Sequence, residues 1–355
     1  MVRKKITRDM LKRIDKDNML DLLLTFPNQC ERAMAIGKIT AINNRYNISY
    51  RNIVFLGLGG SAIGADIIRS YLIDESKIPM HVVRDYTVPE FVNQETLIFA
   101  TSYSGNTEEV ISAYHEAKKR KSNIIIITSG GKLEELAKGD NNLLVTIPKG
   151  FPPRCALGYS FIPALAVLSK LNVIGDKTRE IKDSITLLKR MLKNDVGPNV
   201  KNNVSKTIAS RVFGKFPVIY AAAKYFDVAA VRWRGQLAEN SKVLASMHVY
   251  PEMNHNEIVG WVEPSDLLKK FVIITLRDKS DHPRVKKRMD ISKSILEKSG
   301  FKVIEVYSKG NTLLSRILSL IFIGDFVSFY LSIMYGINPT PVERVTYLKK
   351  RLADK

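Results

Sequence analysis

Cysteine is scarce in this chain of 355 residues, which contains only Cys30 and Cys155. Two cysteines are too few for the disulfide framework of a small secreted domain. The opening residues are charged and lack the apolar stretch of a signal peptide. Both absences favour a reducing environment, and we therefore expect a cytoplasmic protein.

Acidic residues are outnumbered, with 35 Asp and Glu against 55 Lys and Arg, so the formal net charge is +20. This excess makes nucleic acid a candidate partner. The basic residues are nevertheless dispersed, apart from short clusters at 3–5, 118–121 and 349–351, and no zinc-finger spacing or RNP-type aromatic motif accompanies them. We expect no nucleic-acid partner, and a local positive site would suit a small anionic substrate.

Only one apolar run is long enough to need a membrane check, and it spans residues 313–336. Arg316 and Asp325 interrupt this run. A carboxylate at the position of Asp325 would lie near the middle of the bilayer, which costs a few kcal/mol. The run therefore predicts a buried helix of a large soluble domain, and we expect no membrane association.

Short apolar runs alternate with helical patterns along both halves of the chain. Predicted strands lie at 80–85, 96–102, 123–129 and 142–148, and then at 216–222, 271–278 and 302–308. This alternation predicts an α/β fold with parallel sheets that helices cover on both faces. Residues 176–213 instead repeat apolar side chains at helical spacing. We predict an N-terminal domain over 1–170 with a helical opening, a helical connector over 171–214, and a C-terminal domain over 215–355 that ends in a helix.

A strand, a glycine-rich turn and a helix are predicted in NIVFLGLGGSAIGADIIRSYL, residues 52–72. Glycines at 59 and 60, followed by Ser61, let backbone N–H groups approach an anion at a helix N-terminus. The run fails the dinucleotide fingerprint, because the G-x-G-x-x-G pattern from Gly57 needs glycine at position 62 and finds Ala62. We therefore expect no dinucleotide cofactor.

A second turn, in TLIFATSYSGNTEEV at 96–110, gathers hydroxyl side chains where a strand meets a helix. Ser102, Ser104 and Thr107 follow a predicted parallel strand, and ligands of open α/β sheets bind at that end of the strands. Their hydroxyl groups can donate several hydrogen bonds to one phosphate. The alternative is that Asn106 or Thr107 only caps the next helix. Capping accounts for one of these hydroxyls and leaves the others unexplained.

The sequences GLGGSAIGADI and SYSGNTEE resemble the sugar isomerase (SIS) fold, in which these two turns bind a sugar phosphate. PRCALGYSF at 153–161, PEMNHNEIVGW at 251–261 and the ending GINPTPVERVTYLKKRL are similar to signatures of the archaeal bifunctional phosphoglucose/phosphomannose isomerases. The resemblance implies two SIS domains of flavodoxin-like, three-layer αβα architecture, each with a mainly parallel sheet. It also implies a sugar 6-phosphate bound by Gly59, Gly60, Ser61, Ser102, Ser104 and Thr107.

Interconverting an aldose phosphate and a ketose phosphate moves a proton between C2 and C1. This step needs a base and a cation that faces the developing oxyanion. The resemblance assigns the base to Glu239, in RWRGQLAENSK, whereas the alternative is an exposed glutamate paired with Lys242. It assigns the cation to Arg154, which follows two prolines, whereas the alternative is an ordinary surface arginine.

Ring opening needs a further proton donor and acceptor. The resemblance implies His255 for this role, contributed to the active site of a partner subunit, so that a homodimer is expected. His248 is the nearest competitor, and we predict that it lies on a strand. Lys349 is the lysine implied to assist ring opening, with Lys350 as the open alternative. Thr340 is implied to lie near C2 of the sugar.

The resemblance thus implies reversible isomerisation of glucose 6-phosphate and mannose 6-phosphate to fructose 6-phosphate through a cis-enediol. One base can serve both substrates because they differ only at C2. We expect no metal, since the chain has no His-x-His cluster or cysteine ligand pair. The alternatives are a non-catalytic SIS module that binds a sugar phosphate, and an aminotransferase domain, for which Cys30 lacks the context of an N-terminal catalytic cysteine.

Overall fold

The first half of the chain builds a five-stranded sheet in the computed structural model, which describes residues 6–353. All neighbouring strands are parallel, in the order β2-β1-β3-β4-β5. The strands are β1 (Asn52–Leu56), β2 (Met80–Val83), β3 (Thr96–Ser102), β4 (Asn123–Thr128) and β5 (Leu143–Thr146). The connecting helices are α4 (Gly60–Leu72), α5 (Glu108–Lys119) and α6 (Gly131–Gly139), and α7 (Leu157–Lys170) follows β5.

The second half repeats this arrangement with four parallel strands in the order β7-β6-β8-β9. The strands are β6 (Phe216–Ala222), β7 (Ser246–Tyr250), β8 (Phe271–Arg277) and β9 (Val303–Tyr307). The helices between them are α10 (Asp227–Ser241), α11 (Ser265–Leu268) and α12 (Pro283–Lys298). In each half the second strand in the chain lies at the edge of the sheet, beside the first strand, so the two halves share this part of their topology. His248 lies on β7, as predicted.

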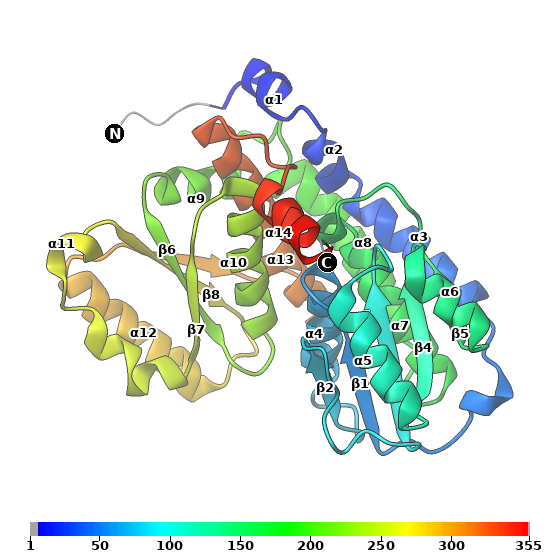
Figure 1. Ribbon diagram of the computed structural model, residues 1–355. Helices are drawn as coiled ribbons and strands as arrows, with labels where there is room; N and C mark the ends of the chain where they lie inside the picture. Colours follow the sequence, from blue (N-terminus) through cyan, green and yellow to red (C-terminus); the bar gives the residue numbers. More distant parts are fainter. Residues whose placement is uncertain (1–5, 354–355) are drawn as a thin grey trace.

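The remaining helices join and cover these two sheets. They are α1 (Arg8–Ile14), α2 (Met19–Leu24), α3 (Phe26–Ile39), α8 (Thr178–Met191), α9 (Val204–Val212), α13 (Leu313–Tyr335) and α14 (Glu343–Ala353). Figure 1 shows the sheets in separate halves of the molecule, with α4, α10 and α13 between them. The predicted division at residues 170 and 214 remains a prediction, and the basic cluster at 3–5 lies outside the described residues.

The strands place alternate side chains in different cores, because successive side chains point to opposite faces of a sheet. On β1, Ile53 and Phe55 enter a core that also contains residues of the second half, whereas Val54 and Leu56 enter a smaller core on the other face. The larger core extends along the chain from Ile14 to Met334. It therefore joins the two sheets.

Helix α13 is the centre of this shared core. Among the described helices it alone is long and apolar enough to cross a membrane, and its apolar window is wholly buried inside the protein. Its one carboxylate, Asp325, is buried and accepts two hydrogen bonds from the Arg232 guanidinium, at 3.0 and 2.9 Å. The prediction of a buried helix is confirmed, and the charge that interrupts the apolar run has an internal partner.

Candidate active site

Two helix N-termini lie at the carboxyl edge of the first sheet, because α4 follows β1 and α5 follows the neighbouring strand β3. The N-cap residues are Gly59, with φ +52°, and Thr107. Gly59 has no side chain, and the side chain of Thr107 does not bond the first turn of α5. Helix N-termini that lack a capping side chain present N–H groups and partial positive charge to an anion.

The hydroxyl turn is folded by bonds among its own side chains. The hydroxyls of Ser102 and Thr107 lie 2.7 Å apart, and the Ser102 oxygen also accepts the N–H of Gly105 at 3.2 Å. Ser104 is exposed, and its hydroxyl accepts the N–H of Asn106 at 3.3 Å. Thr107 is thus the N-cap by position, while its side chain bonds Ser102. Simple capping is therefore not the role of this hydroxyl.

Gly60 allows the first glycine turn to lie directly against the segment that carries Arg154. A Cβ at position 60 would meet the backbone oxygen of Pro153 at 2.7 Å and the Cα of Arg154 at 3.1 Å. Ser61 follows in the first turn of α4 and is buried. Glycine is required here for close backbone approach, which links the predicted phosphate turn to the predicted cation.

Arg154 is buried, with 3% of its surface exposed, and every described bond of its guanidinium leads to the second half of the chain. Its Nε donates to Asn240 at 2.7 Å, and its Nη1 lies 3.4 Å from the carboxylate of Glu239. Its Nη2 donates to the backbone oxygens of Pro339 and Thr340 at 2.9 and 2.8 Å. The surface-arginine alternative is therefore wrong.

Glu239 faces Arg154 and does not pair with Lys242 through its side chain. The Lys242 ammonium donates instead to the backbone oxygens of Glu239 and Pro341. Burial, and then the charge of Arg154, lower the pKa of this lysine. The side chain of Glu239 stays 39% exposed, so it can reach a bound molecule.

Glu239 and Arg154 line a cleft of about 230 Å³ together with Gly59 and Gly60. Its walls come from both halves of the chain, α4 on one side and α10 on the other. The remaining lining residues are Ile63, Arg84, Val231, Arg232, Arg234, Gly235 and Gln236. The cleft therefore brings the predicted base, the predicted cation and the glycine turn together.

A network of buried polar side chains, formed by Arg232, Gln236 and Asp325, packs beside this cleft. Asp325 accepts hydrogen bonds from Arg232 and, at 3.0 Å, from Gln236. Arg232 also donates to the backbone oxygen of Arg154 at 2.9 Å. Burial raises the pKa of the Asp325 carboxyl, and the guanidinium of Arg232 works against that rise. This network fixes the backbone on both sides of the predicted base and cation.

The remaining predicted residues differ in their distance from the cleft. Thr340 lies beside Arg154, and its hydroxyl is buried without a hydrogen-bond partner in the described part of the chain. Lys349 lies on α14 and is exposed, as is Lys350. His255 lies in a short 3₁₀ turn, Glu252–His255, and is also exposed. Neither Lys349 nor His255 lines the cleft of the single chain.

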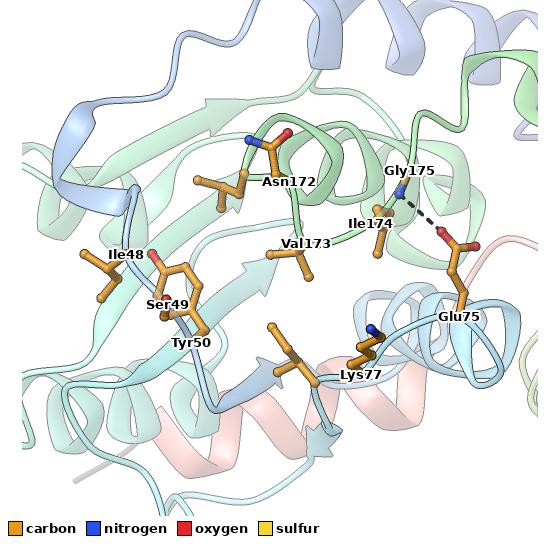
Figure 2. A pocket seen from close by; sticks show the side chains of 11 residues that line it. Ile48, Ser49, Tyr50, Glu75, Lys77, Asn172, Val173, Ile174 and Gly175 are labelled. Atoms are coloured by element: carbon orange, nitrogen blue, oxygen red, sulfur yellow. Dashed lines mark hydrogen bonds between the residues drawn. The ribbon is translucent and has the colours of Figure 1, made fainter.

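A wider hollow of about 690 Å³ lies elsewhere, at the amino-terminal ends of β1 and β2. Figure 2 shows Ile48, Ser49 and Tyr50 on one side of it and the segment from Asn172 to Gly175 on the other. Glu75 closes one end by accepting the N–H of Gly175 at 3.2 Å. None of the predicted site residues lines this hollow, so size alone does not identify the site.

The sequence prediction missed Arg84, Arg232 and Arg234 in the cleft lining. The buried carboxylate of Asp325, in a long apolar helix, signals that some cationic partner must be buried with it, but it does not say that this partner is Arg232. Arg84 follows β2 at the carboxyl edge of the sheet, where ligands bind. No sequence pattern distinguishes Arg234 from the other exposed arginines.

Comparisons with known proteins agree with this fold. Residues 48–152 match the SIS domain family, and residues 201–352 match the bacterial phospho-glucose isomerase C-terminal SIS domain. Among solved structures, a hypothetical protein from Thermus thermophilus superimposes with a TM-score of 0.74 at 15% identity, covering 98% of this chain and 93% of that one. This likeness supports the fold alone.

Two curated relatives cover almost the whole chain, and both are named bifunctional phosphoglucose/phosphomannose isomerase. The protein of Caldicellulosiruptor bescii is 42% identical over 95% of this chain and 99% of its own length. That of Aquifex aeolicus is 41% identical over 85% of this chain and 91% of its own. With two SIS domains and a cleft in which the glycine turn meets Glu239 and Arg154, this chain belongs to the family of bifunctional phosphoglucose/phosphomannose isomerases.

Proposed function

We propose that this protein interconverts glucose 6-phosphate and mannose 6-phosphate with fructose 6-phosphate. The observation that carries the proposal is the pairing of Glu239 with Arg154 in a cleft that the phosphate-binding glycine turn also lines. A carboxylate base, a fixed guanidinium and a phosphate cradle are the groups that an enediol mechanism needs.

In the proposed reaction, the phosphate binds at the N-termini of α4 and α5, where Gly59, Gly60, Ser61, Ser102, Ser104 and Thr107 lie. The Glu239 carboxylate removes the proton from C2 of the open-chain aldose, and the electron pair passes to the C1 oxygen as the cis-enediolate forms. Arg154 faces the oxyanion and stabilises its charge. A proton then passes from the C2 hydroxyl to the C1 oxygen, and Glu239 returns its own proton to C1, which gives the ketose with its carbonyl at C2. The reverse sequence gives either aldose.

Ring opening precedes these steps, and the proposal assigns it to His255 and Lys349. Both side chains are exposed, and neither lines the cleft of its own chain. We therefore propose a homodimer in which His255 of one subunit completes the cleft of the other. Mixing His255→Ala and Glu239→Gln subunits tests this arrangement, because a shared site restores partial turnover while independent sites restore none.

The proposal includes both epimers and no metal. One base suffices because loss of the C2 proton gives the same enediol skeleton from glucose and mannose. Thr340 is the residue proposed to leave room at C2, and its buried hydroxyl beside Arg154 has no hydrogen-bond partner among the described residues. The proposed chemistry needs no metal ion as Lewis acid, because the guanidinium of Arg154 stabilises the negative charge that develops on the enediolate oxygen.

The decisive experiment is a coupled assay of the purified protein in EDTA, with each sugar phosphate offered separately. Turnover of both, reduced about 10²- to 10⁴-fold in Glu239→Gln, is expected for loss of a catalytic base. Glu297→Gln, an exposed glutamate of α12, is the matched control and should keep full activity. Binding of glucose 6-phosphate without any turnover would instead support a non-catalytic sensing module.

A further inference from the structure

The cleft contains more guanidinium groups than the proposed chemistry uses. Four arginines line it, namely Arg84, Arg154, Arg232 and Arg234. Arg154 lies against Glu239, and Arg232 is buried with its guanidinium bonded to Asp325. The other two arginines have no role in the proton transfer, and their positions point to the charged end of the substrate.

Arg84 lies beside the glycine turn. It directly follows β2, and the N–H of Gly57, at the start of that turn, donates to the backbone oxygen of Val83 at 3.2 Å. The side chain is 43% exposed, and its Nη2 pairs with the carboxylate of Asp66. One contact through Nη2 leaves the other N–H groups of the guanidinium free, because this group has five donors.

The carboxylate that holds Arg84 is itself fixed from behind. Asp66 lies on α4 with 9% of its side chain exposed, and Arg69 approaches it to 3.8 Å. Arg69 in turn donates to Asp227, the first residue of α10, at 2.8 Å. This chain of ion pairs joins the two halves of the molecule. Arg84 is therefore held in place beside the cleft rather than left to move freely.

Arg234 reaches the same cleft from the other half of the chain. It lies on α10, five residues before Glu239, and is exposed. It forms no ion pair or hydrogen bond with any side chain or backbone group of residues 6–353. A guanidinium in a ligand cleft without a carboxylate partner is available to an anion from solution.

We propose that Arg84 and Arg234 form a two-arginine clamp that binds the phosphate group of the sugar phosphate from both halves of the cleft. The inference rests on the proposed function and extends it. The phosphate is the only charged group of such a substrate, whereas Glu239 and Arg154 act on its uncharged carbonyl end. Two guanidinium groups complement the dianion, which the helix N-termini and the neutral hydroxyls bind without any formal charge of their own.

The clamp makes a specific kinetic prediction. Arg234→Gln removes a charged donor that serves binding alone, so KM for glucose 6-phosphate should rise about tenfold while kcat stays within about twofold. The inhibition constant of inorganic phosphate, used as the probe, should rise by a similar factor. Arg234→Lys should recover part of both effects. Arg284→Gln removes the same charge from exposed α12 and should change neither constant.

Arg84 requires a gentler substitution, because deleting it leaves the Asp66 carboxylate without its closest partner. Arg84→Lys keeps the ion pair and removes the forked geometry, and it should also raise the phosphate inhibition constant. If both Arg234→Gln and Arg84→Lys leave KM and phosphate inhibition unchanged in an active enzyme, the clamp is refuted and the isomerase proposal stands. If the wild type turns over no sugar, calorimetric titration of inorganic phosphate into the same variants decides, and equal affinities refute the clamp.

Discussion

Replacing Gly60 by alanine tests whether the close approach of the glycine turn to the Arg154 segment matters for catalysis. The new Cβ would lie 2.7 Å from the Pro153 oxygen and 3.0 Å from its carbonyl carbon. Ordinary contacts begin near 3.4 Å, so one of the two backbones must retreat by about 0.7 Å. Both contacting atoms belong to backbone, and no flexible side chain can absorb the change.

This displacement moves Arg154 relative to Glu239. A shift of about 1 Å in a positioning group costs about 10²-fold in rate, so we expect kcat/KM of Gly60→Ala to fall about 30- to 100-fold. Overpacking of this kind should also lower the free energy of unfolding by about 1–3 kcal/mol. Steady-state kinetics with glucose 6-phosphate and urea unfolding measure the two effects.

The control for this experiment is Gly139→Ala. Gly139 ends α6, and a Cβ there would meet no atom within 4 Å. This variant should keep full activity and gain up to about 1 kcal/mol of stability from its helix propensity. A value of kcat/KM for Gly60→Ala within about twofold of the wild type would refute the steric reasoning.

Three further predictions concern other parts of the structure. Asp325→Ala leaves the buried Arg232 without its carboxylate and should lower the free energy of unfolding by about 3–5 kcal/mol. The double variant Arg232→Met, Asp325→Leu removes both charges and should lower it by less. Equal losses for the two variants in urea unfolding would contradict this reasoning. Burial raises the pKa of Asp281 to about 6 from 3.8, so the folded state binds this proton more tightly. The contribution of the Asp281 carboxyl to stability is present below about pH 4 and is lost as the pH rises to about 6. Asp281→Asn should remove this pH dependence from the measured profile of unfolding free energy against pH. Thr340→Gln should lower mannose 6-phosphate turnover more than glucose 6-phosphate turnover, and equal ratios in the wild type and the variant would exclude Thr340 as the specificity residue.

The fold and part of the site followed from local patterns in the sequence. The apolar runs at 96–102 and 123–129 predict strands because every side chain of a central parallel strand is buried, and β3 and β4 lie there. The placement of the glycine turn and the hydroxyl turn at the same edge of the sheet was predictable, because the carboxyl ends of parallel strands lie at one edge. Glu239 and Arg154 came from a family resemblance, since their 3.4 Å contact joins residues 85 positions apart.

The rest of the site depends on packing between the halves, which no local pattern encodes. Arg84 and Arg234 enter the same cleft only because α4 lies beside α10 (Figure 1). The exposure of His255 and Lys349 is likewise invisible in the sequence, because both lie in polar stretches that suit a surface as well as an active site. Burial of Asp325 could be expected, whereas its partner among 55 basic residues could not.

The apolar core that runs from the first sheet through α13 to the second has a consequence for how the molecule unfolds. Each half contributes part of its apolar surface to this shared core, so a fragment that ends before α13 would expose side chains such as Phe26 and Trp233, which contact that helix. We expect a single cooperative transition that includes both halves, and no protease-resistant half-molecule. The cleft between α4 and α10 then keeps a fixed width, since a hinge between the halves would have to open the interior of the protein.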